Sequence, residues 1–200
     1  MRFLGDTTNQ KTKGTEMSHI ASLVTVAIVT IKGISPLLMR KMPLIEEPAD
    51  LRNQPPKDQA EWNCYRDETT GRLYIPAANL QRALIGGATY SKGKGRSNLS
   101  KSAAACLRVW PDIIDLGVTN FEIDSRSVVI RATGGRVIRH RAKLNEWKAT
   151  FKIDYSRDLL SEVQVRSIVD DTGARVGLLD FRPEKKGPFG RFVVDHWELE

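Results

Sequence analysis

Three stretches of the chain carry the hydrophobic pattern of regular secondary structure. Residues 23–31 are mostly β-branched and apolar, which predicts a central strand of a sheet. Apolar residues recur at helical spacing between Leu80 and Ala88, and Pro76 suits the first turn of that helix. A second helix follows Asp158, the expected cap, and ends at Gly173.

Alternating patterns near the middle of the chain predict a run of strands. Residues 127–133, 136–144 and 147–155 each read as a strand. Gly134-Gly135 and Asn145-Glu146 separate them, and two-residue links of this kind favour hairpins. We therefore expect a three-stranded meander.

The remaining elements complete an α+β pattern. Residues 176–179 and 192–199 are expected to be the last strands. Shorter elements are expected as helical turns at 56–65, a strand at 73–75, a helix at 99–107 and an edge segment at 109–116. The order of strand, helix, strands, helix and strand predicts a ferredoxin-like fold, of which an RNA-recognition-type antiparallel sheet is one version.

The chain has room for one substantial core. Residues 1–18 are polar and without periodicity, so we expect a flexible leader, and residues 19–200 form a single domain. The segments that the ferredoxin-like pattern does not use predict insertions at about 40–72 and 89–125.

Charge and cysteine content narrow the functional class. The chain has 31 Lys and Arg against 24 Asp and Glu, a net charge of +7 and a pI near 9.5, which favours a polyanionic partner such as nucleic acid. Cys64 and Cys106 have no CxxC spacing, so neither a disulfide framework nor a zinc site is indicated. The longest apolar run is far shorter than a membrane span, and we expect a cytoplasmic protein.

Basic residues concentrate in three segments: the glycine-rich loop at 90–98 with the helix after it, the strand at 136–144, and the Gly- and Pro-rich loop at 177–192. On the strand, a period of two places Val137, Arg139, Arg141 and Lys143 on one face. Charged loops are commonly just solvated, but phosphate contact is the functional interpretation. The candidate contacts are Lys92, Lys94, Arg96, Lys101, Arg139, His140, Arg141, Lys143, Arg182, Lys185, Lys186 and Arg191.

Other residues of the terminal loop suit a nucleic-acid ligand. Gly187 and Gly190 would let the backbone approach a ligand closely. Aromatic side chains near cations can stack on bases, and they are Tyr90, Trp147, Phe151, Phe181 and Phe189. Phe189 is the preferred stacking residue because a Pro- and Gly-rich loop is a difficult place to bury a ring.

Signals for catalysis are weak. None of the three histidines has a partner at metal-ligand spacing, and no hydrolase, phosphate-loop or metalloprotease motif occurs. We therefore predict no catalytic residue, no metal and no cofactor. His140, between two arginines, is the one group with the position of a base for RNA cleavage.

Two segments together resemble a known superfamily. Leu73-Tyr-Ile-Pro-Ala-Ala-Asn-Leu-Gln-Arg-Ala-Leu84 resembles the strand-to-helix signature Ile-Pro-Gly-Ser-Ser-Leu-Lys-Gly-Ala-Leu of the CRISPR-associated RAMP superfamily, and residues 177–192 resemble its Gly-rich loop. Ala77-Ala78-Asn79 and Gln81-Arg82 depart from the signature. Residues 31–39 and the final loop also look like proteins encoded in phage and prophage genomes.

The resemblance implies an RNA-recognition-like fold that binds single-stranded nucleic acid in a prokaryotic cell, with subunits side by side as in CRISPR backbone proteins. RAMP endoribonucleases often carry a histidine near the first helix, and none lies between Leu73 and Ala88. The primary hypothesis is a single-stranded RNA- or DNA-binding protein, RNA first, that forms a homo-oligomer or joins a multi-subunit ribonucleoprotein. The alternatives are a phage-encoded assembly protein and a metal-independent endoribonuclease.

Overall fold

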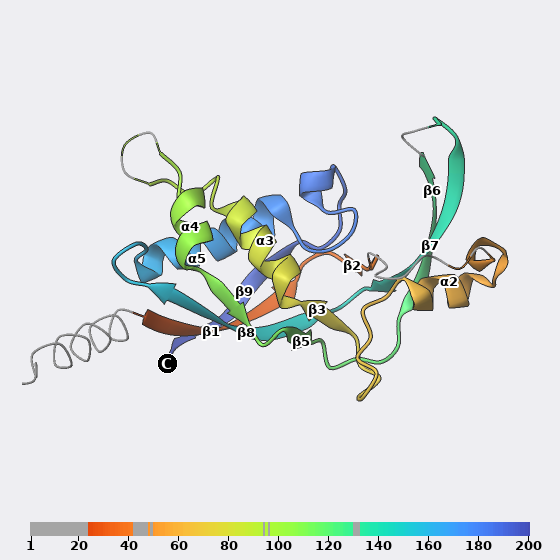
Figure 1. Cartoon of the computed structure of the whole chain (residues 1–200), viewed down its shortest axis with the longest axis horizontal. Coiled ribbons are helices and arrows are strands. Elements are labelled where there is room, and N and C mark those ends of the chain that lie inside the picture. Colours follow the sequence, from red (N-terminus) through yellow and green to blue (C-terminus); the bar gives the residue numbers. More distant parts are fainter. Residues whose placement is uncertain (1–23, 42–47, 49, 94, 96, 130–132) are drawn as a thin grey trace, which may run out of the picture.

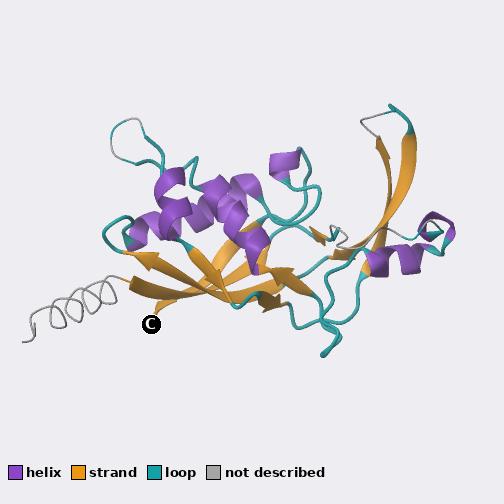
Figure 2. Cartoon of the chain, viewed as in Figure 1, coloured by secondary structure: helices purple, strands orange, loops and turns teal. Residues whose placement is uncertain are grey.

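A four-stranded antiparallel sheet with helices on one face forms the body of the protein (Figures 1 and 2). The computed structural model describes residues 24–41, 48, 50–93, 95, 97–129 and 133–200, so the predicted leader lies outside the described residues. The strands of this main sheet, in spatial order, are β4 (Arg108–Trp110), β8 (Lys148–Ser156), β1 (Val24–Gly33) and β9 (Phe192–Leu199). The helices above it are α3 (Ala77–Gly87), α4 (Ser100–Cys106) and α5 (Glu162–Asp171).

Buried and less buried side chains alternate along the two central strands, and this alternation explains why the helices cover only one face of the sheet. Ala27 pairs with Ile153 and Val29 with Phe151 across β1 and β8, and all of these side chains are buried on the helix side. Apolar residues of the helices, Leu80 and Leu84 of α3 among them, complete the same core. The prediction of a central strand near residues 23–31 is confirmed.

The chain order of the main elements is β1, α3, β4, β8, α5 and β9, and the sheet order is β4-β8-β1-β9. This is the topology of two interleaved βαβ units, the split βαβ or ferredoxin-like fold. The predicted α+β, ferredoxin-like class is therefore confirmed.

Two groups of elements interrupt this frame. Between β1 and α3 lie β2 (Leu37–Leu38), the 3-10 turn η1 (Leu51–Asn53), α2 (Pro56–Trp62) and β3 (Tyr74–Pro76). Between β4 and β8 lie β5 (Ile113–Asp115), β6 (Glu122–Val129) and β7 (Arg136–Leu144). β3 pairs with β5, while β2, β7 and β6 form a second sheet whose β6–β7 hairpin projects from the body at the right of Figure 1. We call this hairpin the arm.

The predicted three-stranded meander is wrong at its second link. β6 and β7 form a hairpin, but β8 joins the main sheet instead of pairing with β7. The chain from β7 to β8 runs beside the chain from β1 to β2, with Leu144 opposite Leu37 and Lys148 opposite Lys32. Asn145-Glu146 is therefore a kink between two successive strands.

The C-terminal helix also differs from expectation at both ends. Ser161, not Asp158, caps α5, in a capping box with Gln164. The helix continues into a π-helical turn, η2 (Thr172–Val176), so the predicted strand at 176–179 does not form. Gly177, at φ 72°, then turns the chain away from the helix. No helix in the described part of the chain is long and apolar enough to span a membrane.

Candidate nucleic-acid interface

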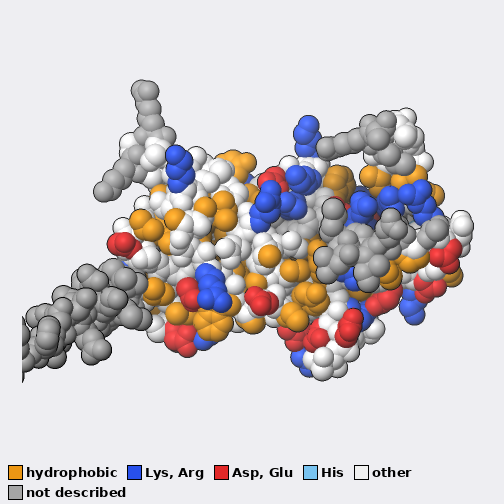
Figure 3. Space-filling model, in the orientation of Figure 1, with side chains coloured by type: hydrophobic (Ala, Val, Ile, Leu, Met, Phe, Trp, Pro, Cys, Tyr) orange, Lys and Arg blue, Asp and Glu red, His pale blue; other side chains and the backbone are white. Residues whose placement is uncertain are grey.

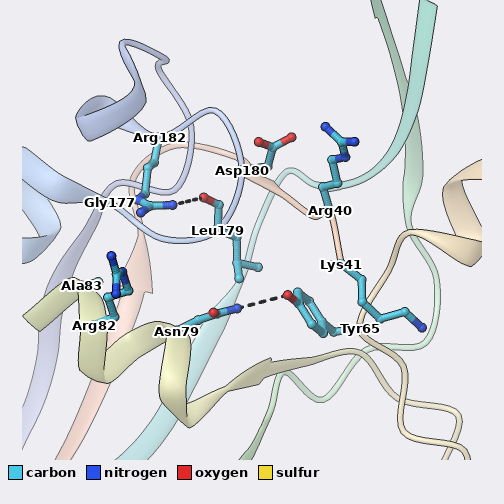
Figure 4. A pocket seen from close by; sticks show the side chains of 10 residues that line it. All are labelled: Arg40, Lys41, Tyr65, Asn79, Arg82, Ala83, Gly177, Leu179, Asp180 and Arg182. Carbon is cyan, nitrogen blue, oxygen red and sulfur yellow. Dashed lines mark hydrogen bonds between the residues drawn. The ribbon is translucent and has the colours of Figure 1, made fainter. Parts of the chain in front are cut away.

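Four chain segments meet beside the first turns of α3. They are the residues after β2, the chain between α2 and β3 at Tyr65, the helix itself, and the loop formed by residues 177–191, here called the C-terminal loop. They enclose a cavity of about 330 Å³ (Figure 4). Its lining residues are Arg40, Lys41, Tyr65, Asn79, Arg82, Ala83, Gly177, Leu179, Asp180 and Arg182.

The start of α3 determines where the helix residues of this cavity lie. Pro76 precedes α3 in an extended conformation, and the amide of Ala77 donates to the Asp112 carbonyl at 2.9 Å, so the helix starts sharply at the end of β3. One turn in, Asn79 Nδ2 donates to the Tyr65 hydroxyl at 3.3 Å. Arg82 follows on the same side of the helix and is exposed.

The C-terminal loop is held by backbone hydrogen bonds to itself and to the chain around β2. Leu178 N donates to Gly190 O at 2.9 Å and joins the two ends of the loop. Asp180 N donates to Leu38 O at 2.9 Å, and Gly190 N donates to Pro36 O at 2.8 Å. The loop is consequently a fixed wall of the cavity.

Two glycines of the C-terminal loop allow its backbone segments to pack closely against each other. A Cβ on Gly187 would lie 1.8 Å from the Phe181 carbonyl oxygen, and one on Gly190 would lie 2.1 Å from the Leu178 carbonyl oxygen. Gly190 also has φ 71°, where a side chain is strained. The structure shows Gly187 and Gly190 in close packing within the loop itself, and no observation tests whether they admit a ligand, which stays a prediction.

Four cations and one carboxylate charge the cavity. Arg182 is oriented by donating to Leu179 O at 2.7 Å and by an ion pair with Glu184. Lys41 Nζ lies 5.9 Å from the centre of the Trp62 ring. Arg40 and Arg82 are exposed and form no ion pair with any described residue.

The single carboxylate of the lining is already neutralised. Asp180 Oδ2 lies 2.8 Å from Arg141 Nε of β7, an ion pair whose approach lacks the alignment of a hydrogen bond. Arg141 is 5% exposed, and this burial lowers the pKa of its guanidinium, which nevertheless remains charged at neutral pH. The cavity thus keeps a positive character (Figure 4).

The predicted basic strand is largely charge-balanced. Period two puts Arg139, Arg141 and Lys143 on one face of β7, as expected, but β6 places Glu122 opposite Lys143, with 2.9 Å between Nζ and Oε2. Arg141 in turn is paired with Asp180. His140 lies on the other face, where its Nδ1 is 2.7 Å from Ser125 Oγ.

The remaining predicted cations lie at the surface. Lys92 and Lys101 are exposed near the C-terminal end of α3 and on α4, while Lys94 and Arg96 lie outside the described residues. Lys185, Lys186 and Arg191 are exposed on the C-terminal loop, beside the cavity that Arg182 lines. Figure 3 shows Lys and Arg gathered toward the middle and right of this face.

The expectation that Phe189 is exposed is wrong. Phe189 is 5% exposed, lies 6.0 Å from Phe181 between ring centres, and has the Arg126 guanidinium of the arm 4.7 Å from its ring centre. The loop can bury this ring because the arm covers it, and that contact is invisible in the local sequence.

Several cavity residues were not predicted. Arg40 and Lys41 follow a short apolar segment, and Arg82 lies within the segment that resembles the RAMP signature, so a cation count of these stretches would have found them. Asn79 lies in the same segment, at a position that departs from the signature, and Tyr65 carries no sequence signal for this site. Only the tertiary fold brings Tyr65 and Asn79 to the cavity.

The groups with catalytic potential lie elsewhere. His140 lines a separate cavity of about 390 Å³ with Arg52, Gln59 and three neighbours on β7. Burial raises the pKa of the Cys64 thiol to about 11, which keeps it protonated near neutral pH. Among the described residues no group of three or more His, Cys, Asp or Glu is placed to hold a metal ion.

Comparison with known proteins adds a structural relationship. No protein-family model matches the chain, and no curated protein matches its sequence. A chain in the cryo-EM structure of the type III-B Cmr-beta bound to cognate target RNA aligns with a TM-score of 0.59 and 12% identity, over 99% of this chain and 68% of that chain. At this identity the similarity concerns the fold, and it agrees with the ferredoxin-like topology described above.

Proposed function

We propose that this protein binds single-stranded nucleic acid, with RNA as the first candidate, at the cationic cavity beside α3. One observation carries the proposal: Arg40 and Lys41, Arg82 and Arg182 come from three distant segments and line one cavity. Cations from separate elements that converge on one site suit phosphate groups, and charge-assisted hydrogen bonds to phosphate are strong.

The surroundings support an extended ligand. Lys185, Lys186 and Arg191 provide further exposed charge on the C-terminal loop. The similar fold occurs in a chain from an RNA-bound assembly, and the segments 73–84 and 177–192 resemble the RAMP superfamily. We therefore propose that the protein is a RAMP-like subunit of a ribonucleoprotein.

The test is fluorescence anisotropy with single-stranded RNA, single-stranded DNA and duplex DNA across a salt series, with nuclease-treated protein. Arg40→Ala/Arg82→Ala should weaken binding to every sequence and flatten the slope of log K against log salt by about 1.4, or about 0.7 for each lost phosphate contact. Absence of binding by the wild type would refute the proposal.

A matched control separates the site from overall charge. Lys32→Ala/Arg108→Ala removes the same charge from exposed positions on the face of the main sheet opposite the helices. This variant should bind with nearly wild-type affinity and slope. Equal effects in the two variants would show that net charge, not the cavity, accounts for binding.

A second candidate function, self-assembly, is favoured by the arm. Ile123, Val129 and Ile138 are 41%, 53% and 65% exposed, and the register of β6 and β7 puts them on the same face. β6 is also an edge strand, which leaves backbone groups available for pairing. Apolar groups on a projecting hairpin suit contact with another copy of the chain.

Light scattering after nuclease treatment and in high salt tests self-assembly. An oligomer that persists under these conditions and dissociates in Ile138→Asp would support it, because apolar contacts resist salt whereas phosphate contacts weaken. A wild-type monomer throughout would refute it.

A further inference from the structure

One aromatic side chain stands apart from all the others. Among the aromatic residues that the structure describes, Tyr90 alone is exposed, at 52%. It lies three residues after the end of α3, where its backbone amide donates to Gly87 O at 2.9 Å. The exposed part of this ring is accessible to a ligand that can stack on it.

The ring of Tyr90 is paired with an arginine from another helix. The guanidinium carbon of Arg175, in the π-helical turn after α5, lies 5.2 Å from the ring centre. The Arg175 side chain is itself 58% exposed. A planar guanidinium beside an aromatic ring is a surface on which a nucleobase stacks well.

One carboxylate, that of Asp171, holds Arg175 directly and the backbone beside Tyr90 through Ser91. Arg175 Nε lies 3.1 Å from Asp171 Oδ1, and Ser91 Oγ, next to Tyr90 in the chain, donates to Asp171 Oδ2 at 2.8 Å. Ser91 is 3% exposed, so this bond is sheltered from water. The arginine and the backbone that carries the tyrosine are therefore held in place before any ligand arrives, which reduces the entropy cost of binding.

Two helices must pack very closely to create this pair. A Cβ on Gly87 would lie 2.0 Å from Thr172 Oγ1, so only glycine lets the end of α3 meet the turn that carries Arg175. In the sequence, Gly86-Gly87 reads as a weakened last turn of the helix. In the structure, Gly87 is where α3 touches the π-helical turn.

The pair lies within reach of the cationic cavity along α3. Arg82 lines the cavity and lies five residues before the end of α3, about 8 Å along the axis at the rise of a helix, and Tyr90 follows that end by three residues. Gly86 lies between them and faces Glu184 of the C-terminal loop, whose carboxylate is paired with Arg182. A strand a few nucleotides long would span this distance, and exposed Lys92 lies just beyond Tyr90.

We propose that Tyr90 and Arg175 form a second subsite for the single strand, a platform on which one base stacks after the backbone leaves the cavity. This proposal rests on the proposed function, since it assumes that the cavity holds the phosphates of the same strand. The ligand class is a nucleobase of single-stranded RNA or DNA. Stacking is tolerant of sequence because every base has an aromatic face.

The test compares Tyr90→Ala and Tyr90→Phe in binding to a fluorescent oligouridine across a salt series. Tyr90→Ala should weaken binding on the order of tenfold, the scale of one lost base stack, while Tyr90→Phe retains the ring and wild-type affinity. The salt slope should stay unchanged in Tyr90→Ala, because no phosphate contact is lost. Thr89→Ala, at the exposed neighbouring position, is the matched control.

A second measurement locates the base directly. Ultraviolet crosslinking of wild-type protein to an oligonucleotide that contains 5-iodouridine, followed by peptide mass spectrometry, should place a crosslink on Tyr90. If Arg40→Ala/Arg82→Ala weakens binding but Tyr90→Ala binds like the wild type, the platform is refuted and the cavity assignment stands. If the wild type binds no single strand, both fail.

Discussion

Arg141 Nε of the arm lies 2.8 Å from Asp180 Oδ2 of the C-terminal loop, and this ion pair joins the arm to the body of the protein. The Arg141 side chain is 7% exposed and the Asp180 side chain 27%. The same two segments also meet where Arg126 covers Phe189. The arm and the loop that walls the cavity therefore share a polar and an aromatic contact.

Loss of Asp180 should be more costly than loss of a surface carboxylate. Asp180→Ala leaves the buried Arg141 without its partner, and we expect the free energy of unfolding to fall by about 3 kcal/mol in urea titrations. Glu184→Ala, which breaks the exposed pair with Arg182, should cost less than about 1 kcal/mol. The double variant Arg141→Met/Asp180→Ala should recover part of the loss, and an additive or larger loss would contradict this account.

Alanine substitutions at Gly190 and Gly117 distinguish the cost of a steric clash from the cost of backbone strain. Both have a φ near +70°, but a Cβ at Gly117 would meet nothing within 4 Å, whereas one at Gly190 would lie 2.1 Å from Leu178 O. Gly117→Ala should therefore cost only the strain of a positive φ, about 1–2 kcal/mol. Gly190→Ala should cost clearly more in the same urea titration, and equal losses would show that the loop relaxes.

The exposed cations of the C-terminal loop should act through phosphate contacts. Lys185→Gln/Lys186→Gln/Arg191→Gln keeps long polar side chains, and it should weaken single-strand binding with a salt slope reduced by up to about 2. Lys32→Gln/Lys148→Gln/Lys152→Gln removes the same charge from the main sheet, where Lys148 and Lys152 already have carboxylate partners. Anisotropy across salt should show little change in this control. An unchanged slope in the loop variant would remove these three residues from the site.

Cys64 should make the protein less stable in alkali. Burial raises the pKa of its thiol to about 11 in the folded state, above about 8.5 in the unfolded chain. Between these values the folded state holds the proton that the unfolded state releases, so the free energy of unfolding falls as pH rises. The fall contributed by Cys64 is about 1.4 kcal/mol per pH unit from about pH 9 to 11. The difference between wild type and Cys64→Ala in urea titrations isolates it, and parallel pH profiles would argue against a shifted thiol.

Periodicity in the sequence was sufficient for the elements that pack against one common core. The strand near residues 23–31 and the helix from Pro76 to Ala88 show their buried faces directly in the order of apolar residues, and the fold class followed from them. Prediction failed where the same local sequence pattern is compatible with two different strand pairings. Asn145-Glu146 has the composition of a hairpin link, but the chain continues into another sheet, where β8 pairs with β1 while β7 pairs with β2.

The same limit applied to Phe189 and Tyr90. A ring in a Pro- and Gly-rich loop looks exposed and a ring after a helix looks ordinary, yet the arm covers Phe189 while Tyr90 is 52% exposed. Burial of a single ring depends on what a distant segment brings to it. That information is absent from a window of neighbouring residues.

The sequence by itself determined the basic character of the protein, the ferredoxin-like order of its main elements and the segments that carry loop cations. Only the tertiary structure decided which charges are free to bind, because ion pairs such as Arg141 with Asp180 and Lys143 with Glu122 join residues from different elements. It also assembled Arg40, Arg82 and Arg182 around one cavity. Charge is a property of each residue, whereas a binding site depends on distances that folding sets between residues far apart in the chain.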